Sequence, residues 1–88
     1  MSDLEKQFEE AAERVKAGAD KIGALADDKK LEVYALFKQG STGDVNIARP
    51  GMLDPKGKAK WDAWNERKGM TKEEAMQAYV ELANDLLA

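Results

Sequence analysis

The chain has 88 residues, a formal net charge of −3, and neither cysteine nor histidine. Its length predicts one domain over residues 1–88, too small to enclose a deep active site. The missing cysteine and histidine exclude the thiolate nucleophile, the commonest general base and the commonest transition-metal ligand. The acidic balance argues against nonspecific binding of duplex DNA, for which a basic surface is usual.

The sequence predicts neither a membrane span nor a secretory leader. No apolar run approaches the roughly 18–20 residues that a transmembrane helix needs. The N-terminal stretch MSDLEKQFEE is acidic and lacks an apolar core. We therefore expect a cytoplasmic protein without stable membrane insertion.

The N-terminal part of the chain carries a helical pattern. Ser2 followed by Glu5 fits a capping box, in which each side chain accepts a hydrogen bond from the other residue's backbone amide. Hydrophobic residues then recur at helical spacing on one stripe: Leu4, Phe8, Ala11, Ala12, Val15 and Ala19. The pattern predicts a helix over about 3–16, followed by a loose connection, AGADKIGALA, that Gly18 and Gly23 punctuate.

A second helix is predicted from Asp27 or Asp28, either of which can cap it, to about Gly40. One arc of this helix carries both aromatic and cationic side chains: Lys30, Leu31, Tyr34, Phe37 and Lys38. Two neighbouring rings flanked by ammonium groups suit a flat base with a phosphate beside it. The alternative is that both rings belong to the hydrophobic core.

The segment STGDVNIARPGML that follows has 13 residues without helical periodicity. Connections between helices usually have about 2–8 residues. An extended residue covers about 3.3 Å, whereas a helical residue rises by about 1.5 Å, so this loop can run back along the whole second helix. A third helix can then lie parallel to the second.

That third helix has a strong start, because Asp54 is a good N-cap and Pro55 suits the first helical position. Gly69 is predicted to end it. Thr71 and Glu74 form a second capping box. Apolar residues follow at helical spacing to the end of the chain: Ala75, Met76, Tyr79, Val80, Leu82, Ala83, Leu86 and Leu87. The whole pattern predicts an all-α fold of four helices.

Cations gather with tryptophans in KGKAKWDAW, at the start of the third helix. Lys56 and Lys60 are four residues apart and face the same way. Together with Lys58 they oppose the helix macrodipole, which favours anions at this end. Such a placement makes sense if an anion binds there. The alternative places Trp61 and Trp64 in the core and leaves the lysines as a solvated face.

Other candidate groups do not point to catalysis. Glu9, Glu10 and Glu13 lie on the polar side of the first helix and are interpreted as a solvated face. The glycines form neither a P-loop nor a dinucleotide fingerprint. We therefore expect no enzymatic activity, no metal and no cofactor.

The run YALFKQGSTGDVN, followed by RPGMLDPKGKAKWDAWNERKGMTKEEAMQAYV, resembles the acyl-CoA-binding protein family, also known as diazepam-binding inhibitor. The likeness is dense over residues 34–80 and looser at FEEAAERVK. It implies a four-helix bundle with up-down-down-up topology and a long loop between the second and third helices. It also implies reversible binding of medium- to long-chain fatty acyl-CoA by a monomeric intracellular carrier that meets acyl-CoA-using enzymes transiently.

The resemblance also implies roles for the residues that bind the nucleotide part of the ligand. Tyr34 and Phe37 match the positions that face adenine, and Lys38 and Lys60 match those that hold the ribose 3′-phosphate. This chemistry agrees with the pattern of rings and cations read from the second and third helices.

Four further positions complete the implied ligand-binding set. Lys56 and Lys16 match positions that serve the remaining phosphates and the ligand edge. Tyr79 matches another contact position on the last helix, and Leu31 lies towards the acyl part.

Three features depart from the family pattern. Phe37 stands where many relatives carry tyrosine, so a hydroxyl is missing. The segment AGADKIGALADDKK is about three residues longer than usual and lacks the usual proline, and Lys30 replaces a frequent apolar residue. The last two features leave the shape of the acyl groove and the preferred chain length open.

Two other functions remain open from the residues alone. The chain could be a helical interaction module whose aromatic residues are all core and whose long loop holds a protein partner. It could also bind single-stranded RNA on its stacking rings, although no nucleic-acid partner is expected. Titration with acyl-CoA, free CoA and an oligonucleotide distinguishes the three.

Overall fold

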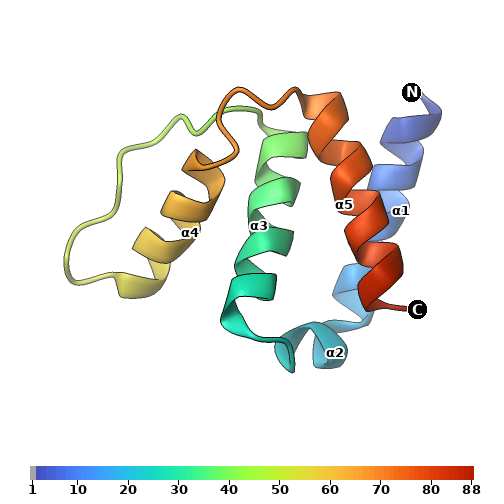
Figure 1. The fold of residues 1–88 in the computed structure, drawn as a ribbon, viewed down its shortest axis with the longest axis horizontal. Helices are drawn as coiled ribbons and strands as arrows, with labels where there is room; N and C mark the ends of the chain where they lie inside the picture. The colour runs from blue at the N-terminus through green and yellow to red at the C-terminus, as the bar shows by residue number, and fades with distance from the viewer. Residues whose placement is uncertain (1) are drawn as a thin grey trace.

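The computed structural model describes residues 2–88 and contains only helices and connecting segments over that range. The helices are α1 (Asp3–Ala17), α2 (Ala19–Gly23), α3 (Asp27–Ser41), α4 (Pro55–Asn65) and α5 (Lys72–Leu86). In Figure 1, α1 and α5 run in one direction and α3 and α4 in the other. The predicted all-α, up-down-down-up arrangement is therefore confirmed, with the long loop returning from the end of α3 to the start of α4.

The four predicted helices are all present, and the described residues add one short helix to them. Helix α2 lies within the segment that was predicted to be a loose connection, and Gly18 alone separates it from α1. Its five residues span little more than one turn, which is too short for an apolar periodicity to be recognised. Ile22 and Leu25 in this region are half-buried, so the helix is held by contacts that the local sequence does not reveal.

The third predicted helix is also shorter than expected. Helix α4 ends at Asn65, and turns lead from there to Gly69. Gly69 has a φ of +93°, in the left-handed region that favours glycine. The chain therefore reverses at the predicted glycine, but the α-helical bonds have ended one turn earlier.

The helix caps match the sequence signals only in part. At α5, the Thr71 hydroxyl accepts from the Glu74 amide and the Glu74 carboxylate accepts from the Thr71 amide, both at 3.0 Å, so this capping box is complete. At α1, the Ser2 hydroxyl accepts from the Glu5 amide at 3.1 Å, but the Glu5 carboxylate meets the Ser2 hydroxyl instead of its amide. That capping box is half formed.

Helix α3 begins differently from the prediction. Its N-cap is Ala26, which offers no side-chain hydrogen bond, and Asp27 and Asp28 lie in the first turn. Their carboxylates still favour the helix start, since they face the positive end of the macrodipole. At α4 the predicted cap is correct, because the Asp54 carboxylate accepts from the Gly57 amide at 3.0 Å.

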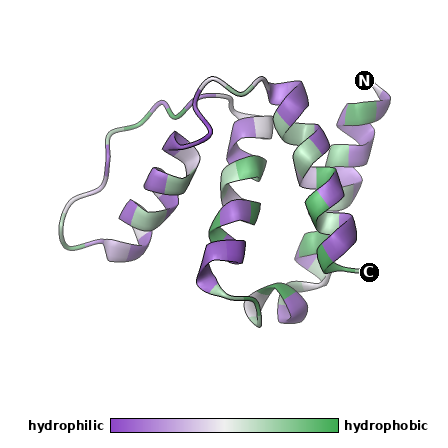
Figure 2. Ribbon diagram, in the orientation of Figure 1, coloured by the Kyte–Doolittle hydropathy of each residue, from purple (hydrophilic) through white to green (hydrophobic). Residues whose placement is uncertain are grey.

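The core lies where α5 packs against α1 and α3. Its centre is a group of three rings from three helices. The ring centroid of Phe8 is 5.6 Å from that of Phe37 and 5.2 Å from that of Tyr79, and Phe37 and Tyr79 are 5.8 Å apart. Gly40 permits this approach, because a Cβ there would come within 3.1 Å of the Phe8 ring. Figure 2 shows that hydrophobic and hydrophilic residues share each long helix, as expected when one face is buried.

Helix α4 is attached mainly through α3 and the long loop. Trp64 is 2% exposed, and its Nε1 donates to the Gly43 carbonyl at 2.8 Å. Trp61 is half-buried, and its Nε1 donates to the Ile47 carbonyl at 2.7 Å. The alternative that placed the tryptophans in the core is thus correct for Trp64. Both indoles hold the loop against α4.

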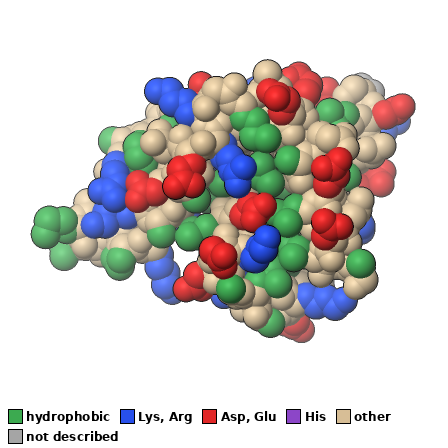
Figure 3. Space-filling model, viewed as in Figure 1, with side chains coloured by type: hydrophobic (Ala, Val, Ile, Leu, Met, Phe, Trp, Pro, Cys, Tyr) green, Lys and Arg blue, Asp and Glu red, His purple; other side chains and the backbone are tan. Residues whose placement is uncertain are grey.

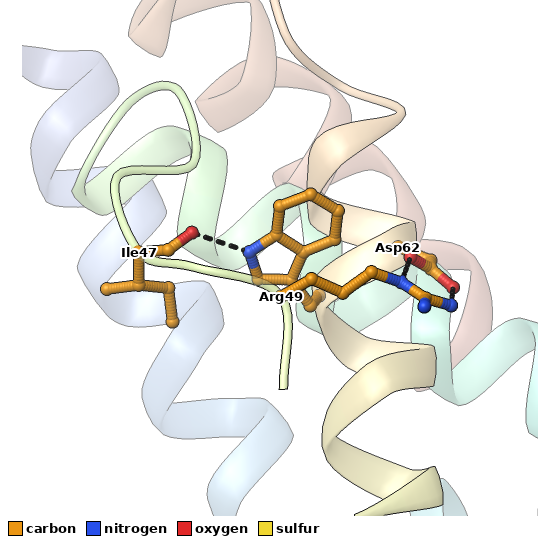
Figure 4. A network of polar contacts seen from close by, with 4 residues as sticks. Ile47, Arg49 and Asp62 are labelled. Carbon is orange, nitrogen blue, oxygen red and sulfur yellow. Dashed lines mark hydrogen bonds and ion pairs between the residues drawn. The ribbon is translucent and has the colours of Figure 1, made fainter. Parts of the chain in front are cut away.

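An ion pair adds a third connection between the loop and α4. The Arg49 guanidinium donates to both carboxylate oxygens of Asp62, at 2.8 and 2.9 Å (Figure 4). The hydrogen bonds from Arg49 hold the pKa of the Asp62 carboxyl below its ordinary value. The bidentate geometry gives the pair a directional preference that a single contact lacks.

A buried amide joins the end of α3 to both connecting segments. The Nε2 of Gln39, a fully buried residue, donates to Asp44 Oδ1 at 2.9 Å and to the Met70 carbonyl at 2.8 Å. Asp44 Oδ1 also accepts from the Gly69 amide at 2.9 Å. Because both neighbours of the amide nitrogen are acceptors, the Gln39 oxygen faces away from them and has no partner within residues 2–88.

This network predicts a loss of stability in acid. The hydrogen bonds from Gly69 and Gln39 lower the pKa of Asp44 from its ordinary 3.8. A lowered folded-state pKa means that the stabilisation is complete above the unfolded-state pKa and is lost as the pH falls through the folded-state pKa. Urea unfolding of the protein below about pH 4 should therefore show a declining free energy, and Asp44→Asn should reduce the steepness of that decline. Equal pH profiles for the two proteins would contradict this role of Asp44.

Candidate ligand-binding site

The first of two adjoining hollows, the central hollow, lies mainly between α1 and α3. It has a volume of about 530 Å³. Its lining is Ala12, Glu13, Val15 and Lys16 of α1, Lys30, Val33, Tyr34, Phe37 and Lys38 of α3, and Tyr79 of α5. It therefore contains five of the eight sequence-predicted residues.

The second, the side hollow, lies between α3 and α4 and measures about 410 Å³. Its lining is Asp27, Lys30, Leu31, Lys56, Ala59 and Lys60. Lys30 lines both hollows, and the Lys60 ammonium lies 5.4 Å from the ring centroid of Tyr34, so the two hollows meet at these side chains. Each of the eight predicted residues thus lines one hollow or the other.

The charges around both hollows favour an anion. Five lysines line them, against the two carboxylates of Glu13 and Asp27. Lys30 lies 3.9 Å from Asp27, which is a long contact for an ion pair on the surface. Because the chain as a whole carries a net charge of −3, this cationic region is a local field in an acidic protein.

A larger hollow, of about 680 Å³, lies on the other side of Phe37 and is a poor candidate for an anion. Its floor includes Phe8 and Met76, but its rim carries four carboxylates and the single cation Lys72. Those carboxylates would repel a phosphate. The smaller central hollow is therefore the better candidate for an anionic ligand, because lysines line it.

The predicted aromatic residues differ in how far they reach the central hollow. Tyr34 is half-buried beside Lys60, and Phe37 is half-buried between the hollow and the core rings. Tyr79 is 3% exposed and belongs to the core, and burial raises the pKa of its hydroxyl. The alternative that placed Tyr34 and Phe37 in the core holds for one side of Phe37. Tyr34 lies outside the described core cluster and its packed neighbours.

Two predicted lysines rest against aromatic faces. The Lys38 ammonium lies 4.9 Å from the centroid of a Trp64 ring, and the Lys60 ammonium lies over Tyr34. Exposed contacts of this kind contribute only about 0.5–1 kcal/mol. Both ammonium groups can therefore turn from a ring to a phosphate at small cost.

Sequence reasoning missed how the lysines of α4 are positioned. The positions of Lys56 and Lys60 are set by α4. The position of α4 is set in turn by the indole hydrogen bonds to the Ile47 and Gly43 carbonyls. A buried indole N–H generally needs an acceptor, so the two tryptophans alone indicate that such hydrogen bonds exist. The acceptors are loop carbonyls, however, and the sequence gives no sign of which carbonyls they are.

The part of the chain that the structure describes contains neither a candidate metal centre nor a membrane span. Within residues 2–88, no group of three or more acidic, histidine or cysteine side chains is placed to hold a metal ion. None of the helices described here is long and apolar enough to cross a membrane.

The bundle and its hollows point first to a class: a small helical binding protein for an anionic ligand with a flat group. The sequence model of the family described as "Acyl CoA binding protein" matches residues 5–83. The chain therefore belongs to the acyl-CoA-binding protein family, as the sequence resemblance implied.

Individual relatives agree over nearly the whole chain. An acyl-CoA-binding protein homolog of Drosophila melanogaster is 48% identical over 85 residues, 97% of this chain and 95% of its own. Acyl-CoA-binding protein homolog 1 of Caenorhabditis elegans is 48% identical over 81 residues, 92% of this chain and 91% of its own. The crystal structure of Oryza sativa acyl-CoA-binding protein 2 has a TM-score of 0.87 and 40% identity, covering 96% of this chain and 90% of that one.

Proposed function

We propose that residues 1–88 form one domain that binds medium- to long-chain fatty acyl-CoA esters reversibly and carries them in the cytoplasm without chemistry. The observation that carries the proposal is the meeting of five lysines with Tyr34 and Phe37 around two adjoining hollows. Membership of the acyl-CoA-binding protein family supports the choice of ligand.

The nucleotide end of the ligand suits the central hollow. Adenine is flat and stacks on Tyr34 and the free side of Phe37, because offset-stacked aromatic rings attract each other. The 3′-phosphate binds Lys38 and Lys60, which approach from α3 and α4. Lys16 of α1 lies on the opposite wall of the central hollow and holds the edge of the ligand, as does the part of Tyr79 that lines it.

The remaining phosphates and the acyl chain suit the side hollow. Lys56 reaches the phosphates from the first turn of α4, and Leu31 and Ala59 supply apolar surface for the acyl chain. Lys30 lies between the two hollows, where its aliphatic stem covers apolar surface while the ammonium stays in water. The replacement of an apolar residue by Lys30 is therefore compatible with an acyl chain beside it.

The proposal assigns the chain a binding role only. It acts as a monomer, needs no metal or cofactor, and delivers its ligand to acyl-CoA-using enzymes by transient contact.

Removing a phosphate-binding ammonium tests the site. Lys38→Ala and Lys60→Ala should each weaken the binding of palmitoyl-CoA by about 1.5–3 kcal/mol, the scale of a hydrogen bond to a charged group. The fold should survive, since Lys60 is exposed and Lys38 only half-buried. Calorimetric titration measures the loss.

Lys58→Ala is the matched control for that experiment. Lys58 carries the same charge on the same helix, between Lys56 and Lys60, but lines neither hollow. Its removal should leave the affinity within about 0.5 kcal/mol of the original value, as expected for a surface site. Equal losses for Lys58→Ala and Lys60→Ala would show a general charge effect and contradict the assigned phosphate contacts.

A further inference from the structure

The tip of the long loop exposes large hydrophobic side chains. Leu53 is 101% exposed, Met52 is 87% exposed and Ile47 is 59% exposed, and these are the exposed large hydrophobic residues of the described chain. We call Met52 and Leu53, which are adjacent in the sequence, the loop tip. In Figure 3, hydrophobic side chains form the extreme end of the molecule beside a group of Lys and Arg side chains.

The loop tip is held in place, so its exposure is a property of the fold. The Ile47 carbonyl accepts from Trp61, and Arg49 is paired with Asp62. Beyond the tip, the Asp54 amide donates to the Gly51 carbonyl at 3.1 Å, and the Asp54 carboxylate caps α4. Both ends of the segment that carries Met52 and Leu53 are therefore fixed, and little ordering is needed when the tip binds another surface.

The charges near the loop tip are opposite to those of the rest of the chain. Residues 47–60 carry four cations and one carboxylate, Asp54, although the whole chain has 14 cations and 17 acidic residues. Three of these cations, Lys56, Lys58 and Lys60, form no ion pair within residues 2–88. An anionic surface would therefore attract this end of the molecule and repel the remainder.

We propose that the loop tip inserts into the interface of an anionic phospholipid membrane, with Lys56 and Lys58 at the level of the headgroups. Apolar side chains flanked by unpaired cations are the combination that binds such an interface. Two adjacent projecting side chains are too few for a stable protein interface, which takes about 20–30 residues from each partner. The acidic remainder of the chain keeps the attachment weak and reversible.

Docking at this end gives the proposed carrier access to its ligand. This purpose rests on the proposed function, whereas the docking itself does not. Lys56 and Lys60 of the side hollow lie on α4, which begins directly after the loop tip. Acyl-CoA is an amphiphile that partitions into membranes by its chain. A docked protein holds the side hollow next to the surface from which the ligand must leave.

The test is sedimentation of the full chain with phospholipid vesicles in the absence of acyl-CoA. Vesicles of phosphatidylcholine containing about one quarter phosphatidylserine should bind the protein, and vesicles of phosphatidylcholine alone should bind it more weakly. The double variant Met52→Ser with Leu53→Ser should lower the partition coefficient about tenfold or more, because both side chains lose their apolar burial.

Charge reversal provides a second variant and a matched control. Lys58→Glu should weaken binding to the anionic vesicles about fivefold or more. Lys6→Glu makes the same change in net charge on α1, at the opposite end of the molecule (Figure 1), and should have little effect. Equal effects of the two reversals would overturn the proposed orientation.

Four further outcomes test the membrane-docking proposal or separate it from the proposed function. Binding that is unchanged in the double variant, or absent from the unaltered chain, would overturn the proposal. Self-association that the double variant abolishes would show that the loop tip binds a second copy instead. Calorimetry with palmitoyl-CoA in solution should not distinguish the double variant from the unaltered chain. A chain that binds vesicles but not palmitoyl-CoA would refute the proposed function and leave the docking surface standing.

Discussion

The affinity for acyl-CoA is expected to rise by about 0.8 kcal/mol for each methylene group that the protein buries. A series of acyl-CoA esters should therefore bind progressively more tightly from short chains to about C14–C18, and then level off when the apolar surface is full. Leu31 and Ala59 border the hollow into which the chain would extend. Calorimetry across the series measures the slope and the plateau.

Free CoA and palmitate are the controls for the chain-length series. Free CoA has the phosphates but no chain, and should bind far more weakly than the long esters. Palmitate lacks the nucleotide that Tyr34, Lys38 and Lys60 are proposed to hold, and should bind little. A flat response to chain length would mean that the chain is not buried, and the protein would then be better described as a nucleotide binder.

Trp64→Ala is expected to destabilise the fold by about 3–5 kcal/mol, the usual cost of removing a buried tryptophan. The residue is 2% exposed, and the substitution also removes the donor to the Gly43 carbonyl and the ring beneath Lys38. Domains generally have only about 5–15 kcal/mol of stability. Urea unfolding should therefore show a large fall in midpoint.

Trp61→Phe is the control for the tryptophan substitution. It keeps a ring at a half-buried position and loses only the hydrogen bond to Ile47. The expected cost is about 0.5–1.5 kcal/mol, the net contribution of one hydrogen bond. If Trp64→Ala cost no more than Trp61→Phe, the attachment of α4 would not depend on the buried indole.

Local signals in the sequence were reliable where one residue satisfies a nearby backbone group. The Thr71 and Glu74 capping box and the Asp54 cap form as predicted, because all their partners lie within three residues. The same reasoning failed at Asp27, where a neighbouring residue takes the cap position.

The candidate site was accessible from the sequence because its residues repeat at helical spacing. Tyr34, Phe37 and Lys38 share an arc of α3, and Lys56 and Lys60 share one of α4. What spacing cannot show is how two helices approach each other. The contact of Lys60 with Tyr34 exists only because α4 lies parallel to α3.

By itself, the sequence determined the class of fold and the kinds of side chain offered to a ligand. Helical periodicity suffices for these, since it depends on neighbours along the chain. The up-down-down-up topology was implied by the family resemblance. Only the tertiary structure decided that α2 is a helix, and that Trp61 and Trp64 tie the loop to α4. Each of these depends on groups distant in sequence, whose contacts arise when the helices pack and the loop closes over them.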